Sequence, residues 1–376
     1  MSGNMRISFP HMGDYHVPIR AFLQRLYPES EVRSSPPITR ETAVLGARHS
    51  PDFICEPFKY NMGNFIEALE EGANTLFQTG TGCRYGYYGE LQRQILEDLG
   101  YEFRFLCLNR ERALPHKAYR ELGSLGSPLP VFRVTSALLM ALQSIRSMDK
   151  LAGYLRENSC FAERPEEMRA VYAGFLKDLG QVDSLLKVSS LSRASWEKLR
   201  KIPQARGQKP LRVGIVGDLY TVMEPFANYD LERRLIERGV SVSRQMSVSF
   251  LLFPPSKGRK IRAAGGYLRR PVGANGIDSV GQSLRYAKAG YDGILHIKAF
   301  GCAPELNAVP ALMNIRRDFD IPVMHMSFDT HSSEIGIETR LEAFLDMIAM
   351  RRRRDGERLQ SGGGHRVHFH KGSHTR

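Results

Sequence analysis

From Arg6 to Leu108, apolar residues alternate between short strand-like runs and longer stretches with helical spacing. The strand-like runs are Arg6 to Phe9, Asp52 to Cys55, Thr75 to Gln78 and Phe103 to Leu108. The helical stretches, in which apolar positions recur every three or four residues, are Val17 to Leu26, Asn61 to Glu71 and Tyr88 to Leu99. Alternation of this kind predicts right-handed βαβ units and a parallel sheet.

A second alternating block follows a region that lacks strand patterns. Between Ser124 and Gln204 the apolar residues keep helical spacing, and the stretch from Pro203 to Pro210 has the Pro, Gly and polar content of a linker. The strands expected after it are Leu211 to Gly217, Gly293 to Ala299 and Pro322 to Ser327. The helices expected there are Tyr229 to Arg238, Gly281 to Ala289, Val309 to Asp318 and Thr339 to Met350.

These patterns predict an α/β protein with two Rossmann-like parallel-sheet domains joined by a helical segment. The expected boundaries are an N-terminal α/β domain at 1–123, a helical connection and linker at 124–207, a C-terminal α/β domain at 208–350 and a disordered, basic, His-rich tail at 351–376. With 376 residues, each of the two domains is large enough to bury a core of its own.

The distribution of charge narrows the class of ligand. The net charge is +13, of which residues 351–376 carry +6, so the folded body keeps about +7. A charge of that size suits an anionic ligand such as a nucleotide or coenzyme A and does not require a nucleic acid. The basic tail alone would support a different function class, a protein that binds nucleic acid.

Hydropathy and cysteine usage indicate the compartment. No run of 18 or more apolar residues predicts a membrane span, and the first residues lead directly into the strand-like run from Arg6 without a signal-peptide core. We therefore expect a cytoplasmic protein. In a reducing cytosol, five cysteines at irregular spacings are expected to be reduced thiols or metal ligands rather than disulfides.

Three of the five cysteines, Cys55, Cys83 and Cys302, each stand where a strand pattern ends and a helix pattern is about to begin. In open parallel sheets such turns lie at the carboxyl edge, where ligands bind, so the three are expected to converge on one site. Three thiolates with one open coordination position would suit zinc catalysis or a 4Fe-4S cluster. Because no Cys-x-x-Cys pair is present, three unrelated packing or turn cysteines remain an equally open interpretation.

The local setting separates these three cysteines from Cys107 and Cys160. Helix N-termini lower thiol pKa values, and nearby glycines would let backbone N–H groups approach inorganic sulfide. Cys107 lies inside a bulky apolar strand pattern and is expected to be an inert core thiol, and Cys160 is expected to be a structural or surface thiol.

Several longer motifs are distributed along the chain, and three of them contain the three cysteines. They are Phe9–Gly13, Pro36–Thr39, Cys55–Asn64, Gly80–Gln92, Glu224–Asn228, Phe300–Glu305, Phe328–His331 and Thr339–Phe344. In these segments the sequence resembles the 2-hydroxyacyl-CoA dehydratase family, in particular its stand-alone proteins related to acyl-CoA dehydratase activases, and the resemblance extends to the related branch of double-cubane cluster proteins. The resemblance covers Arg6 to about Met350, excludes the tail and is weakest in the helical middle.

The resemblance implies a cofactor, a partner and a chemistry. Cys55, Cys83 and Cys302 match the positions at which the family holds an oxygen-sensitive iron–sulfur cluster, either 4Fe-4S or a double-cubane cluster shared across a dimer. An ATP-dependent activase with its own 4Fe-4S cluster would supply single electrons at low potential. The substrate would be an acyl-CoA, and the assembly a homodimer or heterodimer. The alternative is a non-catalytic iron–sulfur accessory that transfers electrons or binds the activase.

Three further residues are candidates for catalysis. Lys59 follows Cys55 by one helical turn, so its ammonium is placed to reach a cluster or a phosphate. Arg84, next to Cys83, could donate hydrogen bonds to sulfides or substrate, as could its neighbour Tyr85. Glu224 follows a strand end and could polarise or protonate a ligand.

Each of these residues also has a structural interpretation. A surface lysine is the ordinary role for Lys59, and Asp218, weighed with Glu224 as a catalytic acid, is equally suited to cap a helix. Tyr88 is expected to serve packing. The group formed by Asp329 with His331 and Glu334 resembles an acid/base or metal constellation, although a hydrogen-bonded turn is the commoner outcome. The sequence contains no Gly-x-x-x-x-Gly-Lys-Ser/Thr phosphate loop, so ATP hydrolysis is assigned to the partner.

Overall fold

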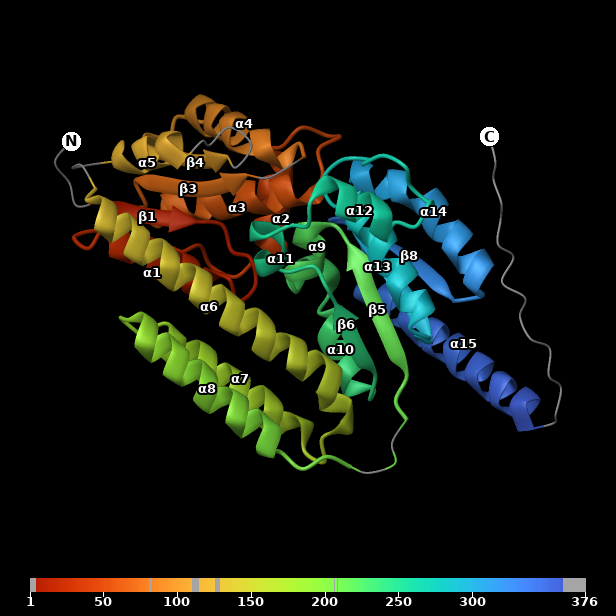
Figure 1. The fold of residues 1–376 in the computed structure, drawn as a ribbon. Coiled ribbons are helices and arrows are strands. Elements are labelled where there is room, and N and C mark those ends of the chain that lie inside the picture. The colour runs from red at the N-terminus through yellow and green to blue at the C-terminus, as the bar shows by residue number, and fades with distance from the viewer. Residues whose placement is uncertain are drawn as a thin grey trace.

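The computed structural model describes residues 5–80, 83–109, 115–125, 129–205, 207 and 209–360, and it has the expected fold class. Two four-stranded, all-parallel sheets are flanked by helices and joined by a long helical segment (Figure 1). Among the described residues, none of the helices combines the length and the apolar content needed to span a bilayer. The basic residues 361–376 of the expected tail lie outside the described residues.

The first domain places its four strands in the order β2-β1-β3-β4. The strands are β1 (Arg6–Phe9), β2 (Glu31–Ser34), β3 (Thr75–Gly80) and β4 (Arg104–Asn109). The helices are α1 (His16–Leu26), α2 (Arg40–Arg48), α3 (Glu56–Glu70), α4 (Tyr85–Asp98) and α5 (Pro115–Gly123). One face of the sheet buries Ile7, Leu23 and Leu106, and the other buries Phe58, Phe65 and Leu76, so helices shield both faces.

The second domain repeats the same strand order, as β6-β5-β7-β8. The strands are β5 (Arg212–Gly217), β6 (Ser241–Arg244), β7 (Gly293–Ala299) and β8 (Val323–Phe328). The helices are α9 (Leu219–Met223), η2 (Phe226–Asn228), α10 (Leu231–Glu237), α11 (Val248–Leu252), α12 (Lys257–Ala263), α13 (Gly276–Lys288), α14 (Ala303–Phe319) and α15 (Glu334–Gln360). All seven residues of β7 are buried, as expected for a central parallel strand.

The helical segment comprises α6 (Val131–Asn158), η1 (Ser159–Phe161), α7 (Pro165–Leu179) and α8 (Leu185–Lys201). Figure 1 shows α6 running from the first domain, where it packs on α1, to the second domain, where it contacts β6. The largest apolar core joins Leu151, Phe175 and Leu199 of this segment to Val213 and Phe344 of the second domain. The segment is therefore part of the second domain's core and does not behave as a loose linker.

Several boundaries differ from the expected ones. Residues 52–55, expected as a strand, form none, because Pro51 and Pro57 lie close on either side and proline cannot donate to a ladder. The fourth strand of the first sheet is instead β2, a short edge strand whose polar residues gave no strand signal; β6 was missed in the same way. Helix α15 continues to Gln360 rather than ending at Met350.

The two domains meet at the carboxyl ends of their strands. A small apolar cluster there contains Ile38, Ala43 and Tyr60 from the first domain together with Tyr220 and Ala227 from the second. Within the first domain, α2 and α3 approach so closely that a Cβ added at Gly46 would lie 1.8 Å from the carbonyl oxygen of Lys59. This contact fixes the first turns of α3, and with them the position of Cys55.

Replacing Gly46 by Ala should destabilise the protein, because the new methyl group cannot fit against the α3 backbone. We expect a loss of about 1–3 kcal/mol or more in the free energy of unfolding, measured by urea denaturation. Gly174 in α7 is the matched control, since a Cβ there meets nothing within 4 Å. Gly174→Ala should stabilise by up to about 1 kcal/mol through helix propensity, and equal effects of the two substitutions would contradict the close contact.

Candidate functional site

One cavity of about 50 Å³ is lined by Cys55, Cys83 and Cys302. Cys83 follows β3 and Cys302 follows β7, each beside the point at which the strand order of its sheet reverses. This is the crevice in which open α/β sheets bind ligands. The three cysteines therefore line one common cavity, which we call the cysteine cavity.

Cys55 reaches the cysteine cavity differently from the way expected. It does not end a strand; it is the N-cap residue of α3, as Cys302 is of α14. Gly301, which has φ +79°, faces Cys55 so closely that a Cβ at this glycine would lie 3.8 Å from the Cys55 Cα atom. The feature that the three cysteines share is thus a position at the start of a helix. A strand end precedes only Cys83 and Cys302.

Burial dominates the electrostatics of the thiols. Desolvation raises the pKa of Cys55 to about 12 and also raises the pKa of Cys302, with the nearby Asp218 carboxylate adding to the second effect. The expected lowering of pKa by helix N-termini is therefore outweighed in the protein without a bound ligand. A thiolate here would need a positive charge inside the cavity to compensate it.

Two tyrosines contact the sulfur atoms. The Tyr88 hydroxyl lies 2.7 Å from Cys55 Sγ, and the backbone N–H of Tyr85 donates to Cys83 Sγ at 3.4 Å. Tyr88 also packs edge-on against Phe58, so its expected packing role is only part of its function. Side-chain and backbone donors to sulfur are the groups that tune a metal-bound thiolate.

Two acids, Asp218 and the buried Glu305, complete the wall of the cysteine cavity. Asp218, the N-cap of α9, accepts hydrogen bonds from Thr221 N at 3.0 Å and Ala299 N at 2.6 Å, so it is a cap that also faces the cavity. Burial raises its pKa. Glu305, which the sequence reasoning did not single out, lies in the first turn of α14 and bonds His296 Nε2 at 2.9 Å. The sequence feature that could have identified Glu305 is its place at the end of the Phe300–Glu305 motif.

The three expected catalytic residues do not line the cysteine cavity. Lys59 pairs with Glu56 at 2.7 Å and faces a different cavity, and Arg84 is exposed at the start of α4. Glu224 is buried, and its carboxylate accepts hydrogen bonds from Gly13 N at 2.6 Å and Phe226 N at 3.0 Å. Its geometry is that of a support between the two domains.

The remaining candidates also have defined places. Cys107 is half-buried on β4 and Cys160 is buried in η1, and neither lines the cysteine cavity. Asp329 accepts hydrogen bonds from His331 N and from Ser332 Oγ, which is the expected hydrogen-bonded turn. Glu334 pairs with Arg234.

The described residues include no group of three or more His, Cys, Asp or Glu side chains that could hold a metal ion. Ligands of a single ion must converge on one point, whereas cysteines that hold a cluster each bind a different iron atom. The three thiols line one cavity, and two of them belong to helix N-cap residues. Comparison of the chain with protein-family models and with curated proteins gives no match to either.

Replacing Glu224 by Ala should cost stability, because Gly13 N and Phe226 N would lose their acceptor. We expect a loss of roughly 2–4 kcal/mol in the free energy of unfolding, measured by urea denaturation. Glu237→Ala is the control, since its half-exposed ion pairs with Arg169 and Arg233 contribute about 1 kcal/mol or less. A fully stable Glu224→Ala protein that lost only activity would instead assign Glu224 to the chemistry.

Proposed function

We propose that this chain is an iron–sulfur protein of the 2-hydroxyacyl-CoA dehydratase type. The observation that carries the proposal is the common cavity lined by Cys55, Cys83 and Cys302, which come from both domains and lie far apart in the sequence. Those three residues would hold the cofactor, a 4Fe-4S cluster or a double-cubane cluster shared across a dimer. Such a cluster supplies single electrons at low potential.

The supporting residues suit an anionic cofactor held by thiolates. The backbone N–H of Tyr85 and the Tyr88 hydroxyl are placed to donate to sulfur, and the helices that begin after Cys55 and Cys302 turn their positive ends toward the cavity. The burial that opposes a bare thiolate favours a thiolate bound to iron, because the metal charge compensates it. Under this proposal, the chain catalyses the ATP-coupled reductive dehydration of a 2-hydroxyacyl-CoA or a related reduction.

A second cavity, of about 510 Å³, supports an acyl-CoA substrate. It lies beside the segment that leads to Cys55, and Arg40, Lys59 and His331 are among the residues that line it. Basic side chains at the mouth of a groove suit the phosphates of coenzyme A. Lys59 would then bind substrate and not the cluster.

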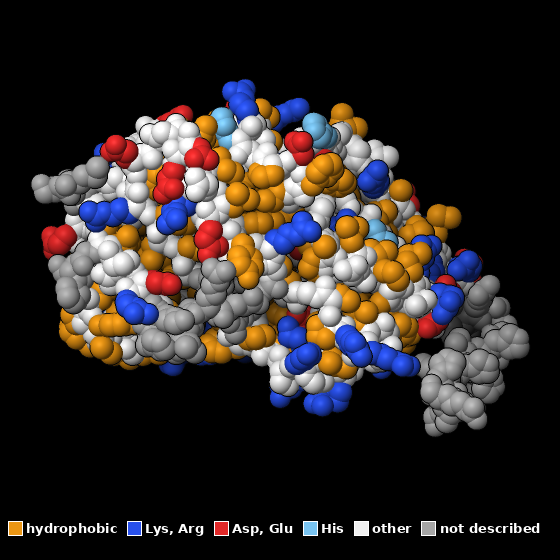
Figure 2. All heavy atoms as spheres, turned by 90° about the horizontal axis from the view of Figure 1, so that it is seen from above, with side chains coloured by type: hydrophobic (Ala, Val, Ile, Leu, Met, Phe, Trp, Pro, Cys, Tyr) orange, Lys and Arg blue, Asp and Glu red, His pale blue; other side chains and the backbone are white. Residues whose placement is uncertain are grey.

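The surface next to the cysteines suits a protein partner. Phe53 is 91% exposed and Phe300 is 58% exposed, and they stand two residues before Cys55 and Cys302 respectively. Figure 2 shows apolar side chains spread over the face that it displays, with charged side chains between them. We propose that an ATP-dependent activase, or a second copy of this chain, docks near these residues in the cytoplasm, because electron transfer requires close approach.

One observation favours the alternative, a non-catalytic accessory that transfers electrons or binds the activase. The cysteine cavity, at about 50 Å³, is much smaller than the roughly 300–1,000 Å³ of ordinary ligand pockets, and none of Lys59, Arg84 and Glu224 lines it. An electron carrier needs no room for a substrate beside its cluster. A dehydratase would have to open the cavity.

Anaerobic purification or reconstitution should give a brown protein with iron and acid-labile sulfide, and Cys302→Ala should lose most of both. Cys160→Ala is the matched control, because Cys160 is a buried cysteine outside the cavity, and it should keep the wild-type content. Iron and sulfide analysis together with EPR provides the measurement. A colourless, iron-free wild-type protein after reconstitution would overturn the proposal.

A turnover assay distinguishes the catalytic function from the accessory function. The reconstituted chain is mixed with an activase, ATP, a low-potential reductant and a 2-hydroxyacyl-CoA, and the enoyl-CoA product is measured. Product formation that Cys302→Ala abolishes assigns the catalytic role. Reduction of the cluster by the activase without product from any substrate in a panel of 2-hydroxyacyl-CoA thioesters assigns the accessory role.

A further inference from the structure

A second site lies on the opposite side of α9 from the cysteine cavity. Asp218 and Tyr220 face the cysteine cavity, whereas Val222 and Met223 line a separate cavity of about 410 Å³. This volume lies within the roughly 300–1,000 Å³ of ordinary ligand pockets. The loop after β1, helices α6 and α7 of the helical segment, and α10 with β6 of the second domain build its walls. We call it the arginine pocket.

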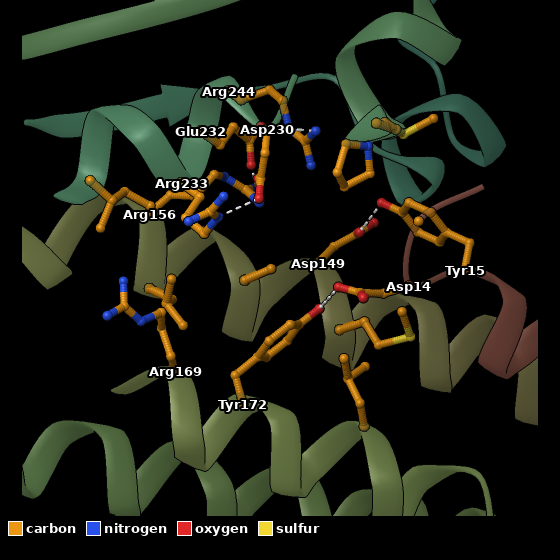
Figure 3. A pocket seen from close by; sticks show the side chains of 18 of the residues that line it. Asp14, Tyr15, Asp149, Arg156, Arg169, Tyr172, Asp230, Glu232, Arg233 and Arg244 are labelled. Carbon is orange, nitrogen blue, oxygen red and sulfur yellow. Dashed lines mark hydrogen bonds and ion pairs between the residues drawn. The ribbon is translucent and has the colours of Figure 1, made fainter. Parts of the chain in front are cut away.

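Two buried guanidinium groups form one side of the arginine pocket. Arg156 of α6 and Arg244, the last residue of β6, each have a side chain that is 8% exposed. Both lie within ion-pair distance of Glu232, at 3.7 and 2.9 Å respectively, and Arg244 also donates to the carbonyl oxygen of Val222. Figure 3 shows Arg156, Glu232 and Arg244 close together.

Some N–H donors of Arg156 and Arg244 have no acceptor within the protein. The Nε atoms of Arg156 and Arg244 are buried and have no hydrogen-bond partner. Glu232 is the one carboxylate shared by the two guanidinium groups, and its Oε1 atom is likewise buried without a hydrogen-bond partner. A buried cation with an unpaired N–H is costly unless an acceptor with negative charge is supplied. The two unpaired Nε atoms point to an anion as the missing partner.

The acidic residues across the arginine pocket already have donors. Asp149 accepts hydrogen bonds from the Tyr15 hydroxyl at 2.5 Å and from Ser249 N at 2.8 Å. Asp14 accepts from the Tyr172 hydroxyl at 3.0 Å, and Figure 3 shows this pair facing the arginines across the cavity. These contacts direct the oxygen atoms of Asp149 and Asp14 at protein donors and not at the two guanidinium groups.

Other parts of the wall are apolar. Met148, Leu155, Leu176 and Ile236 line the arginine pocket, and together they can cover a hydrocarbon or aromatic body. We propose that the arginine pocket binds a small organic anion, whose carboxylate or phosphate group pairs with Arg156 and Arg244 and whose apolar part contacts these side chains. Guanidinium groups bind both kinds of anion through paired N–H donors. The site is independent of the proposed iron–sulfur function.

The test is isothermal titration calorimetry of the full chain with three probes: benzoate, phenyl phosphate and inorganic phosphate. We expect saturable binding of at least one of the two aromatic anions at one site per chain. Inorganic phosphate should bind at least tenfold more weakly than phenyl phosphate, because it has no apolar body to cover the wall. Tighter binding of benzoate would identify a carboxylate ligand, and tighter binding of phenyl phosphate a phosphate ligand.

Arg244→Gln should weaken the binding of the aromatic anions at least tenfold. Arg193 is exposed on α8, so the control Arg193→Gln should leave the affinities for both anions unchanged. If Arg244→Gln fails to fold, Ala173→Phe provides the second variant. Ala173 is exposed on α7 and lines the cavity, so a phenyl group there narrows the site without touching the arginines and should weaken both aromatic anions. The proposal would be overturned if none of the three probes showed saturable binding. It would also be overturned if a folded Arg244→Gln or Ala173→Phe protein kept the wild-type affinity for the aromatic anions.

Discussion

The buried carboxylate of Glu224 forms hydrogen bonds between the two domains at the edge where both sheets end. Glu224, from the second domain, accepts the backbone N–H of Gly13 in the loop after β1, and its other oxygen accepts the N–H of Phe226. The His11 ring lies 3.2 Å from the same carboxylate. With this connection in place, the carboxyl ends of both sheets face one another. The cysteine cavity and the arginine pocket, on the two sides of α9, both depend on that arrangement.

Burial has opposite consequences at the two sites. In the cysteine cavity it raises the pKa of Cys55 and Cys302, so burial favours the protonated form of these two thiols. In the arginine pocket the buried groups are permanent cations, which cannot adapt by losing a proton and therefore need an anion. The same physical cost, the removal of a charge from water, makes the first site suited to a metal cluster and the second to an anionic ligand.

The helical segment has more than a connecting role. Its apolar residues complete the core of the second domain, and α6 and α7 supply Arg156 and Tyr172 to the arginine pocket. Because α6 also packs on α1 of the first domain, the segment braces the two domains against each other. A ligand held between this segment and α10 would therefore contact the elements that set the relative position of the domains.

Local sequence was sufficient for the fold class and for most of the central strands. Continuous apolar runs such as Gly293–Ala299 can be satisfied only by burial on both faces, and the alternation of such runs with helical spacing implies parallel sheets. The short edge strands β2 and β6 could not be found in this way. Their polar residues pair with the sheet along one side only, and the neighbouring strand, distant in sequence, holds them in place.

The three cysteines could be grouped from their positions before helices, but their surroundings could not. The contact of Tyr88 with Cys55, the approach of Gly301 to Cys55 and the place of Glu305 in the cavity wall all join segments whose separation along the chain carries no local pattern. Helix propensity and hydrophobic period act over a few residues, whereas desolvation and hydrogen bonding across a domain interface exist only once the chain has packed. The tertiary structure alone therefore decided that the cysteines line one cavity and that Lys59 does not line it.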